Sequence, residues 1–301
     1  MKAASIIVST YNRANMLKQV LNALLKQLTS HKYEIIVVND NSKDSTKDVL
    51  NQYRKNKRIK IINLKKTMGP AITRNIGIKF AKYPVVIVMD DDCIASPTWL
   101  ENMLKPFSDK KVGISSHYYV KIDGERIFGG TSTAYLKEAV EKVGYFDYRY
   151  TALPLKFTIW EDTDLVFRIL NAGYKAVYAK GANFHHLRVL PRKVIDKISY
   201  VLKRIWIHQA DVLLFKKHPF RASKYFDVTL GFLIPPMRDF KKATGLWKGS
   251  ELSLSSPQGV VFIHGDKFLS KLLIIVSGIF YAFVLKLVRL YGSIRYGKLL
   301  L

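Results

Sequence analysis

Cysteine and acidic residues are both scarce in this chain of 301 residues. Cys93 is the only cysteine, so neither an internal disulfide nor a zinc site built from several cysteines can form. Lys and Arg number 49 against 23 Asp and Glu, which gives a formal net charge of +26. A surplus of this size predicts a polyanionic partner, and the classes to separate are nucleic acid, an anionic membrane and phosphorylated substrates.

Several targeting and binding signals are also missing. The short apolar run after Met1 leads into Tyr11 rather than a small-residue cleavage site, so no secretory signal peptide is expected. Neither Gly-Lys-Ser/Thr nor G-x-G-x-x-G occurs, which removes the main support for Walker-type ATP hydrolysis and for dinucleotide chemistry. The apolar run at 272–285 is shorter than the roughly 20 residues of a spanning helix. The run is therefore an interfacial helix, a core helix or part of a longer tilted span, and its length and basic flanks favour the first two.

Short β-branched runs alternate with helical patterns over the first part of the chain. The runs are at 5–10, 34–39, 59–64 and 84–89, and the helical patterns are at 14–28, 45–56 and 70–81. This alternation predicts an α/β fold with an open, mostly parallel sheet flanked by helices. Ligands of such sheets bind at the carboxyl ends of the strands.

The pattern becomes less regular after residue 115. Helices are expected at 134–143 and 161–171, a strand at 175–179 that continues into 183–186, and a long basic helix or pair of helices at 191–217. Residues 218–267 are expected to form loops and short elements.

Three consecutive carboxylates, Asp90, Asp91 and Asp92, directly follow the fourth expected strand. Adjacent acids repel one another and are costly beside an apolar run unless a cation or hydrogen-bond donors compensate them. Mg²⁺ and Mn²⁺ are natural compensators because they prefer oxygen ligands. A solvated acidic turn is the alternative, but the position at a strand's carboxyl end favours a metal or substrate site.

Other polar residues stand at a strand end and a helix start. Asp40 follows the second expected strand, where an acid can accept hydrogen bonds from a ribose or a base, while the Ser and Asp residues after it are good helix N-caps. Arg74 lies one turn into a helix started by Pro70, where it can meet an acid or a phosphate.

The helix expected over 161–171 begins with a cluster of acids. Asp164 is explained by the helix dipole and by its spacing from Arg168. Glu161 and Asp162 are surplus to that explanation and are candidates for a catalytic base. Later in the chain, His185 and His186 are either structural histidines or ligands of the cation that the acidic triplet needs.

In their order along the chain, these segments resemble the family 2 glycosyltransferases, inverting enzymes of the GT-A fold that use nucleotide-sugars. The resemblance covers residues 3 to 190, and its segments are SIIVSTYNR, EIIVVNDNSKDST, MGPAITRNIGIKFA, VVIVMDDDCIASPTWL, GGTSTAYLKEAVEKVGYFD, EDTDLVFRILNAGYKAV and the final HH. The ordered set is highly specific. No Gln-x-x-Arg-Trp follows the Glu-Asp pair, which disfavours a processive synthase and favours transfer of a single sugar.

The resemblance implies a role for each matched residue. The implied nucleotide-sugar site consists of Thr10, Tyr11, Asn12, Arg13, Asp40, Arg74, Asp90 and Asp91. Asp40 would hold the base, and Arg74 would brace the acids or phosphates. Asp90 and Asp92 match the outer acids of the family's Asp-x-Asp motif, so both are expected metal ligands for Mn²⁺ or Mg²⁺, with His185 and His186 as further candidates. Asp162 matches the catalytic base, and Glu161 is the next candidate.

The domain organisation follows from the same resemblance. Residues 1–115 are expected to form the nucleotide-sugar-binding α/β half, and residues 116–225 the acceptor-binding half of the same catalytic domain. Residues 226–301 are expected to be a C-terminal extension with an apolar, membrane-associating helix.

The expected function is metal-dependent, inverting transfer of one sugar from a UDP-linked donor to a glycan or lipid-linked acceptor, at the cytoplasmic face of a membrane. The alternatives are a polyprenyl-phosphate sugar synthase and, from another class, a non-catalytic membrane scaffold or nucleic-acid-binding protein. The basic tract at 188–204, mixed with Tyr200 and Trp206, favours an anionic membrane or a lipid-linked phosphate. Nucleic acid is disfavoured because the charge is spread along the whole chain without a nucleic-acid fold signature.

Overall fold

The computed structural model describes residues 3–122, 125–152, 157–187, 202–203, 205–223, 228–229, 232–233, 251–256, 259–264 and 283–301. The chain forms two compact units, Met1–Thr151 with Glu161–Leu187, and Ala152–Trp160 with Arg188–Leu301. All three acidic features singled out in the sequence, around Asp40, Asp90 and Glu161, belong to the first unit.

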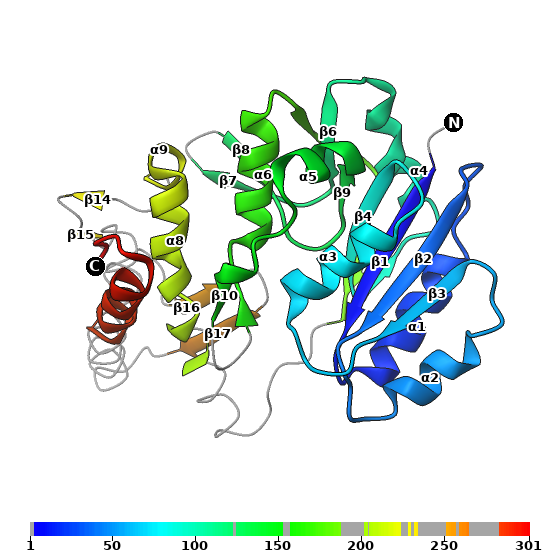
Figure 1. The fold of residues 1–301 in the computed structure, drawn as a ribbon, viewed down its shortest axis with the longest axis horizontal. Coiled ribbons are helices and arrows are strands. Elements are labelled where there is room, and N and C mark those ends of the chain that lie inside the picture. Colours follow the sequence, from blue (N-terminus) through cyan, green and yellow to red (C-terminus); the bar gives the residue numbers. More distant parts are fainter. Residues whose placement is uncertain are drawn as a thin grey trace. The chain divides into compact units, whose positions relative to one another are not determined.

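A seven-stranded sheet with the order β12-β6-β9-β4-β1-β2-β3 is the centre of the first unit (Figure 1). Its strands are β1 (Ala4–Thr10), β2 (Tyr33–Asn39), β3 (Ile59–Asn63), β4 (Val85–Asp90), β6 (Val112–Ser116), β9 (Thr133–Leu136) and β12 (Lys175–Tyr178). The pairs β1–β2, β1–β4, β2–β3 and β6–β12 are parallel, and β9 is antiparallel to β4 and β6. The expected α/β fold with an open, mostly parallel sheet is confirmed.

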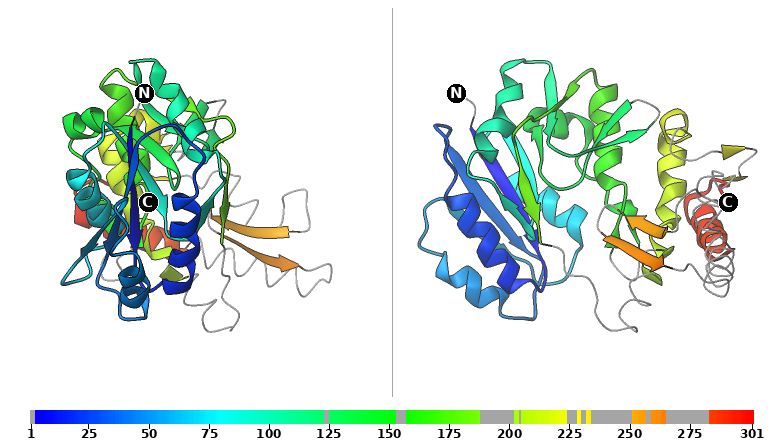
Figure 2. Two further views of the ribbon diagram at one scale, coloured as in Figure 1. Left: turned by 90° about the vertical axis from the view of Figure 1, so that its right-hand side faces the viewer. Right: turned by 180° about the vertical axis from the view of Figure 1, so that it is seen from behind.

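Helices cover both faces of this sheet, which is why its central strands are apolar on both sides. Figure 2 shows α1 (Ala14–Leu25) on one face and α3 (Pro70–Phe80) on the other. The helix α2 (Thr46–Gln52) packs beside α1. Gly77 allows α3 to approach the sheet closely, because a Cβ atom there would lie 2.4 Å from Cγ2 of Ile7. The three helices expected in this region are therefore confirmed, each slightly shorter than its pattern.

The helix expected at 134–143 begins later than its pattern indicated. Residues 133–136 form β9, and the helix α5 (Lys137–Val143) follows directly. Ala134 and Tyr135 are fully buried where β9 pairs with both β4 and β6. A buried position between two strands supplies backbone partners on both sides, and that tertiary pairing overrides the helical preference of the short segment.

The run at 183–186 is a strand, as expected, but it does not continue β12. The chain turns at Gly181, whose φ is +82°, and β13 (Phe184–His186) then pairs antiparallel with β5 (Cys93–Ala95) in a separate two-stranded sheet. This pairing has a direct consequence for the site, because β5 follows the acidic triplet.

The first unit contains several further elements. They are α4 (Trp99–Leu104), the 3₁₀ helices Lys105–Ser108 and Tyr148–Tyr150, the hairpin of β7 (Tyr119–Ile122) and β8 (Glu125–Phe128), and α6 (Glu161–Asn171). The helix α6 has the expected bounds, and Gly173 after it has a φ of +91°, which suits glycine at a helix end. Of the short strands β10 (Thr151–Ala152) and β11 (Phe157–Thr158), β10 has one residue in each unit and β11 belongs to the second.

The second unit contains helices and short hairpins. Its elements are α8 (Gln209–Lys217), α9 (Pro219–Ala222), the hairpins β14 (Val228–Thr229) with β15 (Phe232–Leu233) and β16 (Glu251–Ser256) with β17 (Gly259–His264), and a helix at 283–296. Most of the basic tract at 188–204 and the part of the apolar run before residue 283 lie outside the described residues. Within the described ranges, no helix is long and apolar enough to cross a membrane.

Candidate active site

The residues expected to bind a nucleotide-sugar follow three neighbouring strands. In the parallel sheet Thr10 aligns with Asn39, and Ser9 aligns with Asp90. The loops that begin after β1, β2 and β4 therefore start side by side at the carboxyl edge of the sheet. This register, which the sequence could only imply, brings Thr10, Arg13, Asp40 and the acidic triplet to one edge.

The loop after β1 is fixed to the loop after β2 by Asn12. Its backbone N–H donates to Oγ of Ser42 at 3.0 Å, and its side-chain Oδ1 accepts from the backbone N–H of Lys43 at 2.7 Å. Asn12 has a φ of +53°, a left-handed conformation that asparagine tolerates better than most residues. Next to it, Tyr11 is 46 % exposed, so its ring is available to a ligand.

Asp40 is buried, and both of its carboxylate oxygens already accept backbone hydrogen bonds. The donors are the N–H groups of Met68 at 2.6 Å and Gly69 at 2.9 Å. Asp40 therefore orders the loop that precedes α3. Contact between Asp40 and a base stays a prediction, and it would have to use the remaining lone pairs of the carboxylate.

Arg13 binds two members of the acidic triplet. Its Nη1 donates to Oδ1 of Asp91 at 3.0 Å and also contacts Oδ2 of Asp92. Burial raises the pKa of Asp91 to about 6, although Arg13 opposes that rise. Burial also acts to raise the pKa of Asp92, but His186 and Arg13 together hold it below its ordinary value. Arg13 and His186 thus keep Asp92 in its carboxylate form.

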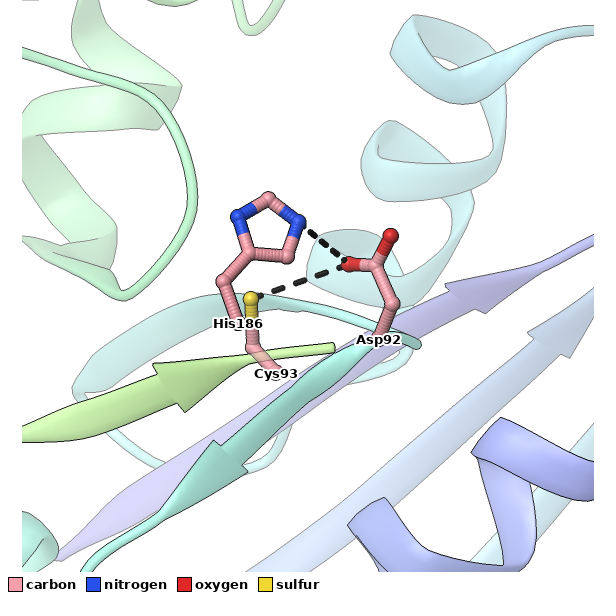
Figure 3. A group of neighbouring side chains, drawn as sticks. All are labelled: Asp92, Cys93 and His186. Carbon is pink, nitrogen blue, oxygen red and sulfur yellow. Dashed lines mark hydrogen bonds and ion pairs between the residues drawn. The ribbon is translucent and has the colours of Figure 1, made fainter. Parts of the chain in front are cut away.

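His186 lies beside Asp92 because β13 pairs with β5. In that pairing His186 is opposite Cys93, and its Nε2 is 3.0 Å from Oδ1 of Asp92 (Figure 3). The neighbouring His185 points to the other side of the strand, where it is exposed, and is not part of this group. The structure therefore separates the two expected histidine ligands.

The donor atoms of Asp92, Cys93 and His186 all lie within 4.8 Å of one another. A carboxylate oxygen and an imidazole nitrogen suit Mn²⁺ well, and the carboxylate also suits Mg²⁺. Cys93 is fully buried and burial raises the pKa of its thiol, which makes it a poor ligand because only the thiolate binds metals strongly. Asp92 and His186 therefore fit the expected cation, whereas the Asp90 carboxylate is turned toward Arg74.

Arg74 connects the triplet to the acids at the start of α6. Its Nη2 donates to Oδ1 of Asp90 at 3.1 Å, and its Nη1 donates to Oε1 of Glu161 at 2.6 Å. Burial and the adjacent Asp162 raise the pKa of Glu161, while Arg74 opposes the rise. Arg74 thus contacts acids from both segments, and its proposed bracing role stays a prediction, as does the role of Glu161.

Asp162 has a different environment from Glu161. One carboxylate oxygen, Oδ1, accepts the backbone N–H of Thr163 at 2.7 Å. The other, Oδ2, faces a Gly-Gly turn so closely that a Cβ atom on Gly129 would lie 3.1 Å from it, and one on Gly130 would lie 3.7 Å from it. The glycine pair therefore leaves this oxygen free of side-chain crowding.

Two features of the site were not singled out from the sequence. The adjacent Gly129 and Gly130 are evident in the sequence, but only the structure places them against Asp162. Thr131 follows them, and its Oγ1 accepts the backbone N–H of Asp90 at 3.0 Å, so it fixes the first residue of the triplet. No local signal distinguishes Thr131 from an ordinary turn residue.

The fold and the site define an α/β protein of the GT-A type, with an acidic triplet at the end of β4 and an Asp-bearing helix start at α6. The model of the family described as "Glycosyl transferase family 2" matches residues 5–168, more than half of the chain. The protein therefore belongs to glycosyl transferase family 2.

Similar proteins include enzymes with larger chains. Chondroitin synthase of Escherichia coli is 33% identical over 103 residues, which is 34% of this chain but only 15% of that protein. The mannosyltransferase PcManGT from Pyrobaculum calidifontis was solved with GDP-Man and Mn²⁺. Its structure matches with a TM-score of 0.66 at 19% identity, and the match covers 97% of this chain and 88% of the PcManGT chain. Staphylococcus aureus TarS with UDP-GlcNAc has a TM-score of 0.52 at 17% identity, covering 70% and 66%.

Proposed function

We propose that this protein is an inverting glycosyltransferase that moves a single sugar from a nucleotide-sugar to an acceptor hydroxyl. The observation that carries the proposal is the position of Arg74, which pairs with Asp90 at the end of β4 and with Glu161 at the start of α6. This bridge holds the candidate base, Asp162, and the candidate cation ligands at Asp92 in one cluster.

Asp162 is the residue proposed to activate the acceptor. Its uncrowded Oδ2 accepts the hydroxyl proton as the acceptor oxygen bonds to the anomeric carbon. The bond from that carbon to the diphosphate breaks, and its electron pair leaves with the nucleoside diphosphate. Because the acceptor attacks the face opposite the leaving group, the anomeric configuration inverts.

A divalent cation at Asp92 and His186 would stabilise the charge of the departing diphosphate. The residues themselves contribute in two further ways. Arg13 keeps Asp91 and Asp92 close together before ligands arrive. The exposed Tyr11 offers a ring on which a base can stack.

We propose a UDP-linked donor and a glycan or lipid-linked acceptor. The UDP-GlcNAc of TarS supports this donor, and the GDP-Man of PcManGT makes a GDP-sugar the necessary comparison in any assay. Mn²⁺ is proposed ahead of Mg²⁺ because an imidazole lies among the ligands. The net charge of +26 supports work at an anionic membrane surface, on its cytoplasmic side.

The deciding experiment is Asp162→Asn, assayed by release of nucleoside diphosphate from UDP- and GDP-sugars with Mn²⁺ and a panel of acceptors. Asparagine keeps the size of the side chain but accepts no proton at neutral pH, so kcat should fall by about 10²–10⁴-fold. Binding of the donor should be unchanged.

The matched control is Asp109→Asn, which makes the same chemical change at a half-exposed carboxylate away from the site. It should keep full activity. Near-normal turnover by Asp162→Asn would return Asp162 to a helix-capping role and make Glu161 the next candidate. A wild-type protein that turns over no donor would favour the non-catalytic scaffold.

A further inference from the structure

The helix at 283–296 turns its small and charged side toward its own unit. Val288 and Ser293 are buried on this side, and Gly292 lies so close to α8 that a Cβ atom there would be 2.5 Å from the carbonyl oxygen of Gln209. Arg295 also bonds to the side chain of Gln209. Close backbone approach fixes how the helix is rotated about its own axis.

A buried ion pair strengthens this attachment. Arg289 donates to Oδ2 of Asp211 at 2.9 and 3.1 Å, and Nδ1 of His208 lies 3.1 Å from the same oxygen. Burial acts to raise the pKa of Asp211, but His208 and Arg289 hold it below its ordinary value. Arg289 and Arg295 thus attach this helix to its unit, and the rotation that they impose decides which residues the other side presents.

The opposite side of the helix is apolar and exposed. The exposed fractions are 60 % for Phe283, 49 % for Leu287, 41 % for Leu290 and 78 % for Ile294, and Tyr291, at the edge of this face, is 45 % exposed while its ring stacks on Trp206. The spacing of these five residues places them on one face of the helix. In a soluble protein a helix normally packs such an apolar face against the core. Here the apolar face is exposed instead, which predicts an apolar partner.

The local charge indicates which partner fits. Residues 267–301 contain six Lys and Arg residues and no Asp or Glu. A second copy of the chain would bring two basic surfaces together, which Coulomb repulsion opposes. An anionic lipid surface satisfies both requirements, because its headgroups attract the four lysines that remain besides the attaching Arg289 and Arg295, and its acyl boundary accepts the apolar face.

We propose that the face formed by Phe283, Leu287, Leu290, Tyr291 and Ile294 binds an anionic lipid bilayer, with the helix parallel to the membrane plane. The described part of the helix, residues 283–296, extends for about 21 Å, and its exposed apolar face runs along that length, so we place this part parallel to the membrane surface. The inference rests on the membrane association proposed above and assigns it to this surface.

The test is flotation of the full chain with vesicles of phosphatidylcholine alone or mixed with phosphatidylglycerol. The wild type should float with the anionic vesicles and much less with the neutral ones. Ile294→Glu and Leu287→Glu should each weaken anionic-vesicle binding at least tenfold, since each loses a buried apolar side chain and adds a repelled charge. Both positions are exposed, so the variants should fold, which circular dichroism checks.

Leu28→Glu is the matched control, because Leu28 is 66 % exposed and lies in the other unit. It should leave vesicle binding unchanged. Absence of wild-type binding to anionic vesicles, or an equal loss with Leu28→Glu, would overturn the proposal. A wild-type dimer that Ile294→Glu converts to a monomer, without vesicle binding, would assign the face to a second copy instead. Nucleoside diphosphate release with a soluble acceptor tests the proposed transfer separately from all of these outcomes.

Discussion

Two arginines bind the acids of the candidate active site, and they do so in different surroundings. Arg74 has an 11% exposed side chain and is held between Asp90 and Glu161. Arg13 has a 43% exposed side chain and reaches Asp91 and Asp92 from the loop after β1. Each arginine contacts two carboxylates, but the two pairings differ in exposure and therefore in how much each contributes to the free energy of unfolding.

The difference lies in what happens when each arginine is removed. Without Arg74, Glu161 and Asp90 lose a buried cation that solvent cannot replace. Without Arg13, solvent gains access from the side where its 43% exposed side chain lay, although Asp91 and Asp92 stay mostly buried. Arg74 is therefore a structural part of the site. Arg13 occupies a position beside Asp91 and Asp92 where an incoming cation can bind next to it or displace it.

The largest effect is expected from Arg74→Leu. Removal of one partner of a buried ion pair leaves the other partner uncompensated, so the free energy of unfolding should fall by about 3–5 kcal/mol. Urea denaturation monitored by fluorescence measures this change. The control Arg54→Leu removes an exposed arginine and should change stability by no more than about 0.5 kcal/mol. A loss below about 1 kcal/mol for Arg74→Leu would erase the contrast between the two arginines.

An intermediate effect is expected from Asp92→Ala, which removes a proposed cation ligand without removing a residue that the strand requires. Stabilisation of the wild type by Mn²⁺ with UDP should reach about 2.7 kcal/mol at a hundredfold excess over Kd. The variant should remain folded and lose that stabilisation. Thermal unfolding with and without the ligands measures it, and an undiminished shift in a folded variant would exclude Asp92 as the essential ligand.

The smallest effect on stability is expected from Arg13→Gln. The free energy of unfolding should change by less than about 1 kcal/mol because the Arg13 side chain is 43% exposed and solvent screens its charge, although its acid partners are buried. The affinity for Mn²⁺ without nucleotide should rise severalfold, since a competing positive charge is gone from Asp91 and Asp92. Isothermal titration calorimetry measures the affinity. A lower affinity in the variant would instead show that Arg13 supports the cation site.

Elements with strong local patterns could be predicted from the sequence. The buried β-branched runs predicted the strands β1 to β4. The bounds of α6 were predicted by the acids at its start and by Gly173 after its end. Local backbone preferences and burial on both faces decide such elements, and both are visible in a short window. The prediction for β9 was wrong because pairing with β4 and β6 determines that segment, and the window does not contain those strands.

The site was predictable as a set of residues and not as a set of contacts. Asp90, Asp92, Arg74 and the Glu161–Asp162 pair were identified from strand ends and helix starts, yet the pairing of Arg13 with the triplet joins residues 78 and 79 positions apart. His186 could not be chosen over His185 before the register of β13 against β5 was known. Contacts of this kind depend on the packing of the whole sheet.

The buried position of Cys93 has a practical consequence for labelling. It is the only thiol of the chain, it is fully buried, and burial raises its pKa, so it should resist maleimide and spin-label reagents under native conditions. A cysteine introduced at an exposed position such as Ile294 would then carry the probe alone. Fluorophores or spin labels can be placed on either unit while the native sequence beside Asp92 stays intact.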